Sequence, residues 1–142
     1  MSNINFFQEE ITFELKDESS ITSWLQSVAT AEGQSIGEIN YIFCSDEYIL
    51  SINEEYLNHD YYTDIITFDN RDNTQDDIEA DIFVSIDRVQ ENAQMIQVPF
   101  DTELRRVMVH GLLHLLGYHD KSEEEISQMR EKEEAYLSLQ KL

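Results

Sequence analysis

The chain is poor in the residues that crosslink, break or loosen a backbone. Its 142 residues include one cysteine, one proline and four glycines. A single cysteine excludes a disulfide within the chain, and Cys44 lies in the apolar run 39–44, where we expect a buried thiol. No proline- or glycine-rich stretch marks a linker, and no segment repeats. With 41% hydrophobic residues, the chain is predicted to form one soluble globular domain over residues 1–142.

Basic residues are also scarce, with 9 lysines and arginines against 30 aspartates and glutamates, for a net charge of −21. This balance excludes a broad basic face, which is the usual footprint of a nucleic-acid-binding protein. The acids are unevenly spread: residues 46–87 carry 13 acids and 1 base, whereas residues 88–119 carry 3 of each. The second stretch leaves room for a local positive site around Arg88, Arg105 and Arg106.

Long hydrophobic runs are absent as well. No stretch approaches the roughly 20 apolar residues of a membrane span. The first ten residues lack the basic start and the apolar run of a signal peptide. We therefore expect a cytoplasmic protein without membrane partners.

Hydrophobic periodicity predicts elements in the order β-α-β-α-β-β-α-α-α. Strands are expected at residues 6–15, 36–45, 63–68 and 79–86, with the polar residues 69–77 as a mobile loop between the last two. Because the first three strands alternate with helices and the last two are consecutive, we predict an α+β fold. It would be a single domain with a mixed four-stranded sheet covered by about five helices.

Capping residues predict where the helices begin. The five starts are expected at Asp17 to Ser20, at Asp46, at Asp87, at Asp101 or Thr102, and at Ser122. The last of these is a capping box, Ser122-Glu-Glu-Glu125, in which the first and fourth side chains bond to each other's backbone N–H. The helix before it is expected to run to about Leu116, and the final helix to about Leu139.

The chemistry of the chain is concentrated in one segment, His110-Gly-Leu-Leu-His114-Leu-Leu-Gly117-Tyr-His119-Asp120. Two histidines four residues apart on a helix lie on one face, so both can reach one ion. Their neighbours are apolar, and burying two imidazoles without hydrogen-bond or metal partners costs free energy. This favours metal ligation over the alternative, in which nearby carbonyls satisfy the two histidines. Gly117 can end the helix in a left-handed conformation, so the chain turns back and brings His119 or Asp120 as a third ligand. Three protein ligands with an open fourth position are typical of a catalytic zinc site.

The register of this segment can be compared with the extended zinc-protease pattern, which has histidines at its first, fifth and eleventh positions. Asp120 falls at the eleventh position, which favours Asp120 over His119 as the third ligand. Gly111 falls at the second position, where a protease has its glutamate base. This argues against peptide hydrolysis by the usual route, and we expect Gly111 to leave space beside the metal for a bulky substrate.

Three ordered blocks resemble a known family. They are His110-Gly-x-Leu-His114-Leu-x-Gly117-Tyr118, Asn53-x-x-Tyr56 followed by Asp60-x-x-Thr63-Asp64-Ile-Ile-Thr-Phe68, and Asp81-Ile82 with Ser85. Together they are similar to the signatures of the YbeY family of bacterial rRNA maturation factors, which are metal-dependent single-strand endoribonucleases. The resemblance covers about residues 46–120. This chain departs from the family where Asp120 replaces a histidine ligand, Leu57 an arginine and Ala80 a glycine.

The resemblance implies a zinc-dependent single-strand endoribonuclease acting in 16S rRNA 3′-end maturation and ribosome quality control. Its partners would be single-stranded RNA, rRNA precursors and components of the small ribosomal subunit, and not DNA. One Zn²⁺ ion would be held by His110, His114 and Asp120, with Fe, Mn or Co also suited to such ligands. His119 is a candidate catalytic proton carrier, the alternative being an exposed turn residue. Arg106 lies one turn before His110, where it would meet a substrate phosphate or pair with an acid.

Two other functions remain open at this point. One is a metalloprotease-like hydrolase with a displaced base, and the other is a non-catalytic, metal-stabilised ribosome-assembly module. With Gly111 in place of the protease glutamate, proton transfer would come from His119, from a water molecule or from the metal's own hydroxide. Thr63, Asp64 and Asp81 either support a ligand histidine or satisfy backbone at a strand start, and the second role is slightly favoured.

Overall fold

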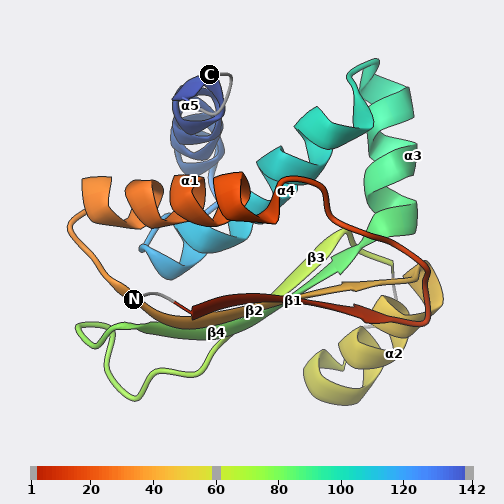
Figure 1. The fold of residues 1–142 in the computed structure, drawn as a ribbon, viewed down its shortest axis with the longest axis horizontal. Helices are drawn as coiled ribbons and strands as arrows, with labels where there is room; N and C mark the ends of the chain where they lie inside the picture. Colours follow the sequence, from red (N-terminus) through yellow and green to blue (C-terminus); the bar gives the residue numbers. More distant parts are fainter. Residues whose placement is uncertain (1–2, 59–61, 140–142) are drawn as a thin grey trace.

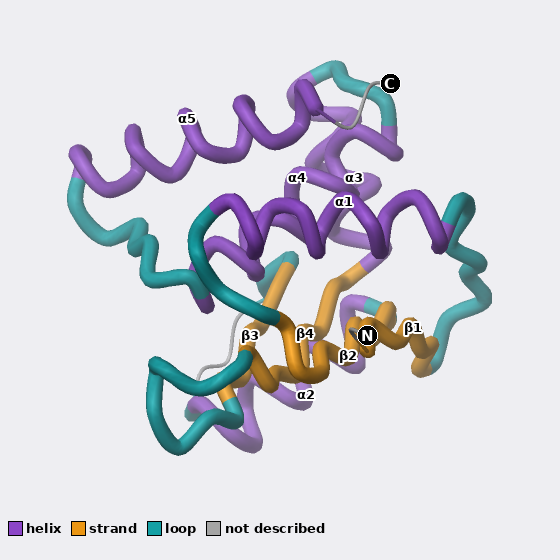
Figure 2. The backbone as a smooth tube through the Cα atoms, turned by 60° about the vertical axis from the view of Figure 1, so that its left-hand side comes forward, coloured by secondary structure: helices purple, strands orange, loops and turns teal. Residues whose placement is uncertain are grey.

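The computed structural model describes residues 3–58 and 62–139, and within them the chain forms the elements expected in the expected order (Figures 1 and 2). Asp60, part of the second family block, lies outside the described residues. The strands are β1 (Asn3–Glu9), β2 (Ile36–Cys44), β3 (Ile65–Asp69) and β4 (Ile78–Ser85). The helices are α1 (Glu18–Ala31), α2 (Asp46–Leu57), α3 (Ile86–Ile96), α4 (Phe100–Leu115) and α5 (Glu123–Leu139).

The four strands form one mixed sheet in the order β1-β2-β4-β3. β1 pairs with β2 and β2 with β4 in parallel, whereas β3 pairs with β4 antiparallel. The predicted α+β class, the mixed four-stranded sheet and its five helices are confirmed. β3, which follows the second helix, stands at one end of the sheet.

Helices cover both faces of the sheet, but unequally. Figure 1 shows α1, α4 and α5 above the sheet and α2 beneath it. The larger core lies under α1, α4 and α5, and α4 is buried at its centre, where the Tyr41 hydroxyl donates to the Met108 carbonyl at 2.9 Å. A smaller core joins α2 to the sheet around Ile49, Ile52 and Ile66. Among the described residues, no helix combines the length and the apolar character needed to cross a membrane.

Cys44 lies in the smaller core, as its apolar run predicted. Its side chain is fully buried at the end of β2. Burial, reinforced by nearby carboxylates such as that of Asp46, raises the pKa of the thiol to about 12. The thiolate is the reactive form of cysteine, so this side chain acts as a small apolar residue.

The first strand was predicted too far along the chain. β1 ends at Glu9, and Glu10 adopts a left-handed backbone with φ of 56°. The alternating apolar residues that follow belong to an irregular segment, where Leu15 is buried and Ile11 and Phe13 pack on the core. A parallel β1–β2 pair needs a connection back across the sheet, and this segment together with α1 provides it (Figure 1).

α2 starts at Asp46 as expected, whereas α3 starts at Ile86, one residue before Asp87, and both helices are capped by a preceding serine. Ser45 caps α2 by accepting from the Tyr48 backbone N–H, and Ser85 caps α3 in the same way from Arg88. Asp46 and Asp87 lie in the first turns, where their charge favours the helix N-terminus. Serine and aspartate cap about equally well, so a neighbouring pair leaves the sequence ambiguous.

The other starts differ in kind. α4 begins at Phe100 directly after Pro99, one or two residues before the expected caps, and α1 begins after Asp17 without a side-chain cap. The capping box of α5 is confirmed: the Glu125 N–H donates to Ser122 Oγ, and the Ser122 N–H donates to Glu125 Oε1.

The polar segment between β3 and β4 is a loop, as predicted, and Arg71 anchors it. The Arg71 side chain is only 2% exposed. Its guanidinium donates to the Asp69 carboxylate and, at 2.8 Å, to the carbonyl of Leu115 at the end of α4. This cation therefore satisfies an orphan carbonyl of the central helix.

Candidate metal centre

The metal centre is built by α4 and the turn that ends it. His110 and His114 lie one turn apart on α4, and their Nε2 atoms are 3.1 Å apart. α4 ends at Leu115, and Gly117 then adopts a φ of +110°. The Tyr118 N–H donates back to the Leu113 carbonyl at 3.0 Å, so the chain reverses as the glycine predicted. This reversal returns the following residues to the two histidines.

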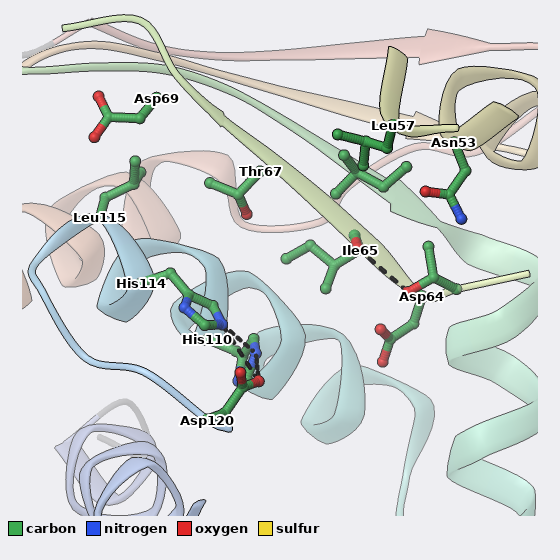
Figure 3. A pocket seen from close by; sticks show the side chains of 12 residues that line it. Asn53, Leu57, Asp64, Ile65, Thr67, Asp69, His110, His114, Leu115 and Asp120 are labelled. Atoms are coloured by element: carbon green, nitrogen blue, oxygen red, sulfur yellow. Dashed lines mark hydrogen bonds and ion pairs between the residues drawn. The ribbon is translucent and has the colours of Figure 1, made fainter. Parts of the chain in front are cut away.

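Asp120 is the residue that the reversal brings to the histidines (Figure 3). Its Oδ2 atom lies 3.4 Å from the Nε2 atom of each histidine. Ligands bound to zinc at about 2.0–2.1 Å in tetrahedral geometry are separated by about 3.3–3.4 Å. The separations of 3.1, 3.4 and 3.4 Å therefore fit three ligand atoms around one tetrahedral ion.

His119, the alternative third ligand, is exposed. It is not in the group of possible ligand atoms found within the described residues, which comprises His110, His114 and Asp120. The structure thus gathers the three residues predicted as ligands. The catalytic role of His119 stays a prediction.

Glu133 is the functional residue that sequence reasoning missed. It projects from α5, is 3% exposed, and places its Oε2 atom 2.6 Å from His110 Nδ1. A carboxylate at Nδ1 keeps the proton on that nitrogen, so that Nε2 presents its lone pair to a metal. The available signal was helical spacing, since Glu133 shares the buried face of α5 with Met129 and Tyr136.

Arg106 is held between two buried carboxylates. Its Nε atom donates to Glu103 at 2.8 Å, and its Nη1 atom donates to Glu133 at 3.2 Å. Hydrogen bonding to Glu103 is the main cause that raises the pKa of this guanidinium. Of the two roles considered for Arg106, the structure therefore shows the pairing with acids. The contact of Arg106 with a substrate phosphate stays a prediction.

The charges at the site favour the protonation states that bind a metal. Burial and the neighbouring His110 lower the pKa of His114, against the opposing effect of Asp120, which favours a neutral ring. Burial acts to raise the pKa of Glu133, but the hydrogen bond from His110 and the charge of Arg106 outweigh it, and the pKa is lowered. A neutral imidazole beside an ionised carboxylate is the usual arrangement around a metal-binding histidine.

A cleft of about 490 Å³ opens beside the triad (Figure 3). It lies between β3, the end of α2 and the histidine face of α4. Three carboxylates line it, those of Asp64, Asp69 and Asp120, and no lysine or arginine is among the described residues of its lining. Leu57, at the position of the family's arginine, is 40% exposed and also lines the cleft.

Gly111 does not leave space beside the metal, so that expectation was wrong. A Cβ atom at this position would lie 2.9 Å from the Cδ1 atom of Ile65 and 3.3 Å from that of Ile82. The missing side chain therefore faces the sheet and allows α4 to approach β3 and β4 closely. A glutamate here would point into the core and not toward the ion.

The polar residues at the strand starts have backbone and side-chain partners of their own. The Thr63 hydroxyl donates to the Ile65 carbonyl at 3.4 Å. The Asp64 carboxylate accepts from Asn92 at 3.4 Å, and burial raises its pKa against the opposing charge of Arg106. Asp81 accepts from Asn40 and from Asn70 across the sheet. The carboxylate that contacts a ligand histidine from outside the triad is Glu133.

The family model described as "Endoribonuclease YbeY" matches residues 3–141. The chain belongs to the endoribonuclease YbeY family. Endoribonuclease YbeY of Cytophaga hutchinsonii is 54% identical over 138 residues, covering 97% of this chain and 96% of that protein. Endoribonuclease YbeY of Flavobacterium psychrophilum is 52% identical over 133 residues, covering 94% of each.

The fold of the family is also seen in a solved structure. The solution structure of a Thermotoga maritima protein superposes with a TM-score of 0.68 at 26% identity, covering 96% of this chain and 88% of that one. Membership in the YbeY family, predicted from three short blocks, thus extends over nearly the whole chain.

Proposed function

We propose that this protein is a zinc-dependent endoribonuclease that cleaves single-stranded RNA. One observation carries the proposal: His110, His114 and Asp120 converge at tetrahedral ligand spacing beside an open cleft, in a chain of the YbeY family. Its proposed role is 16S rRNA 3′-end maturation and ribosome quality control, with rRNA precursors and small-subunit components as partners.

The metal would be held by His110 Nε2, His114 Nε2 and Asp120 Oδ2. A bound Zn²⁺ ion would supply Lewis-acid stabilisation of phosphoryl charge and would lower the pKa of water toward neutrality. Glu133 orients His110, and the burial of Glu133 keeps water from competing for that bond. Asp120 is 41% exposed, so the ligand group faces the cleft from which a substrate would enter.

Proton transfer is assigned to His119. It adjoins Asp120 on the exposed turn, and the position of the protease base is occupied by Gly111, whose side-chain direction is blocked by the sheet. A histidine can accept or donate a proton near neutral pH. Arg106 is proposed to meet a substrate phosphate beside His110, because both side chains line a smaller hollow next to the cleft.

The test combines metal content with substrate choice. Freshly purified protein is assayed for bound metals, and for cleavage of single-stranded RNA and of casein. We expect about one zinc per chain, RNA cleavage that a chelator abolishes, and no casein hydrolysis. His114→Ala should lose both metal and RNA cleavage, whereas His119→Ala should keep the metal and lose activity. Casein hydrolysis by the wild type, or a metal-loaded protein that cuts no RNA, would overturn the proposal.

A further inference from the structure

The outer edge of β3 runs along the cleft beside the metal triad. β3 ends the sheet, so one side of the strand bonds to β4 and the other side faces no strand in the described part of the chain. The cleft is lined by β3, with α2 on one side and α4 on the other, so it follows this edge (Figure 3). A polymer chain that enters the cleft would therefore pass along this edge.

The register with β4 determines which backbone groups face the cleft. The Asp64 carbonyl accepts from the Ser85 N–H at 2.9 Å, and at the other end the Asn70 N–H donates to the Glu79 carbonyl at 2.7 Å. Hydrogen-bonded pairs alternate in an antiparallel ladder, so the even-numbered residues of the strand bond to β4. The odd-numbered residues direct their backbone groups to the free edge, and all three line the cleft: Ile65, Thr67 and Asp69.

The free edge offers several unused donors and acceptors. Among the described residues, the only recorded partner for an outward backbone group is the Thr63 hydroxyl, which donates to the Ile65 carbonyl at a long 3.4 Å. The outward residues recur every ~6.8 Å along the strand. An exposed row of this kind bonds readily to another extended chain.

The charge of the cleft decides which part of an RNA strand can lie against this edge. Among the described residues, its lining includes three carboxylates and no lysine or arginine. The nearby Arg71 is already bonded to Asp69 and to the Leu115 carbonyl, and Arg106, beside the triad, is paired with two buried glutamates. Phosphates would be repelled from such a wall, whereas bases are neutral and carry donors and acceptors on their edges.

We infer that the free edge of β3 binds unpaired RNA bases through the backbone N–H and C=O groups of Ile65, Thr67 and Asp69. The phosphates then face solvent, except at the metal triad, where a cation offsets their charge. This inference rests on the proposed function and explains its substrate class. Bases in a duplex use the same edges to pair with each other, so the strand edge selects single-stranded RNA.

Amide hydrogen exchange tests the inference residue by residue. The metal-loaded wild type is mixed with a short 2′-O-methyl RNA strand, and exchange is followed by NMR. The amides of Ile65, Thr67 and Asp69 should slow on binding, because they gain partners. The amides of Ile66 and Phe68 already bond to β4 and should not change. Binding that protects both sets equally, or neither, would overturn the inference.

A pair of variants at one position gives a second test. Thr67→Pro removes one outward N–H without removing a bond to β4, which edge strands tolerate. Thr67→Val keeps the N–H and removes only the hydroxyl. We expect RNA to bind on the order of fivefold more weakly to Thr67→Pro than to Thr67→Val, with the same metal content in both variants.

The outcomes separate the edge from the nuclease. If the wild type cleaves RNA and a folded Thr67→Pro variant binds RNA as tightly as the wild type, the inference about the β3 edge is overturned. The proposed function is then unaffected. Failure of the wild type to bind or cut RNA overturns the proposed function. Protection of the odd-numbered amides by an extended peptide, but not by RNA, would assign the edge to a protein partner and overturn the RNA assignment. A duplex of the same sequence should protect none of these amides.

Discussion

At the scale of single residues, the candidate metal centre depends on a side chain outside the triad of possible ligands. Glu133 holds His110 at Nδ1 and also accepts from Arg106, which in turn bonds to Glu103. Glu103 and Glu133 are nearly inaccessible to solvent. Buried charges of this kind are tolerated because each one is paired. Loss of one partner leaves the other charge unpaired in an apolar environment. The proposed ligand His110 is therefore the end of a buried chain of ion pairs.

We expect Glu133→Gln to weaken zinc affinity by about 10–100-fold, because an amide orients the imidazole less well and raises its basicity less. Thermal stability should also fall, since Arg106 loses one of its two carboxylate partners. Competition with a chromophoric chelator measures the affinity, and thermal unfolding measures stability. Glu134→Gln, one residue further on the exposed face of α5, should match the wild type. Equal zinc affinity in the two variants would contradict the positioning role of Glu133.

Gly111 can be tested by restoring the glutamate of the protease pattern. We expect Gly111→Glu to destabilise the protein strongly and to create no peptidase, because the new side chain would meet Ile65 and Ile82. Overpacking alone typically costs about 1–3 kcal/mol, and an unpaired buried carboxylate costs more. Gly111→Ala adds a single carbon against the side chains of Ile65 and Ile82 and buries no charge, so it should lose less stability. A stable Gly111→Glu variant that hydrolyses casein would show that the position faces the ion after all.

At the scale of elements, α5 is positioned by a polar cluster at the end of α1. Glu32, just after α1, accepts hydrogen bonds from the Tyr136 hydroxyl, from the Tyr118 hydroxyl at 2.8 Å and from Lys132 Nζ at 3.2 Å. Tyr118 belongs to the turn that carries Asp120, and Lys132 precedes Glu133. One carboxylate therefore ties together α1, the ligand turn and α5.

We expect this cluster to stabilise the fold at neutral pH and to lose that contribution in acid. Burial acts to raise the pKa of Glu32, but the hydrogen bonds from Tyr136, Tyr118 and Lys132 outweigh it and lower the pKa. A lowered folded pKa stabilises the protein above the unfolded value of about 4.3, and the contribution disappears as the pH falls through the folded pKa. We expect Glu32→Gln to cost about 1.5–3 kcal/mol near neutral pH.

The measurement is the free energy of unfolding of wild type and Glu32→Gln between neutral pH and about pH 3. The difference between the two proteins should be constant near neutrality and should shrink below about pH 4. Glu38→Gln, at an exposed position on β2, controls for the loss of one negative charge. A difference that persists unchanged in acid would show that the Glu32 carboxylate is not the source of the stability.

At the scale of the whole molecule, a net charge of −21 acts on both stability and binding. Affinity for RNA normally depends on released counterions, with a salt dependence that grows with the number of phosphates neutralised by basic groups. The described residues that line the cleft include no basic side chain, so the salt dependence of binding should be shallow. On the proposed function, the metal and the edge of β3 would then provide most of the affinity.

We expect Leu57→Arg to tighten RNA binding at low salt and to steepen its salt dependence by about one unit of slope, because it adds one cation to the cleft wall. Leu57 is partly exposed, so the change should leave the fold intact. Fluorescence anisotropy over a series of salt concentrations gives the slope. Leu57→Gln controls for the loss of the apolar side chain. An unchanged slope would mean that RNA phosphates do not pass near the end of α2.

The sequence by itself determined the order of elements and the α+β class, and it predicted the three residues that the structure brings together as possible metal ligands, because these depend on local spacing. Two histidines four apart share a helix face in any fold, and Gly117 reverses the chain through its own backbone freedom. Only the tertiary structure decided what lies behind the ligands and beside them. Glu133 is 23 residues from His110 and is one of many acids on its helix, so its role appears only when α5 packs on α4. The direction of Gly111 depends on how the sheet meets α4, and the free edge of β3 depends on the strand order of the sheet, and no local pattern specifies either.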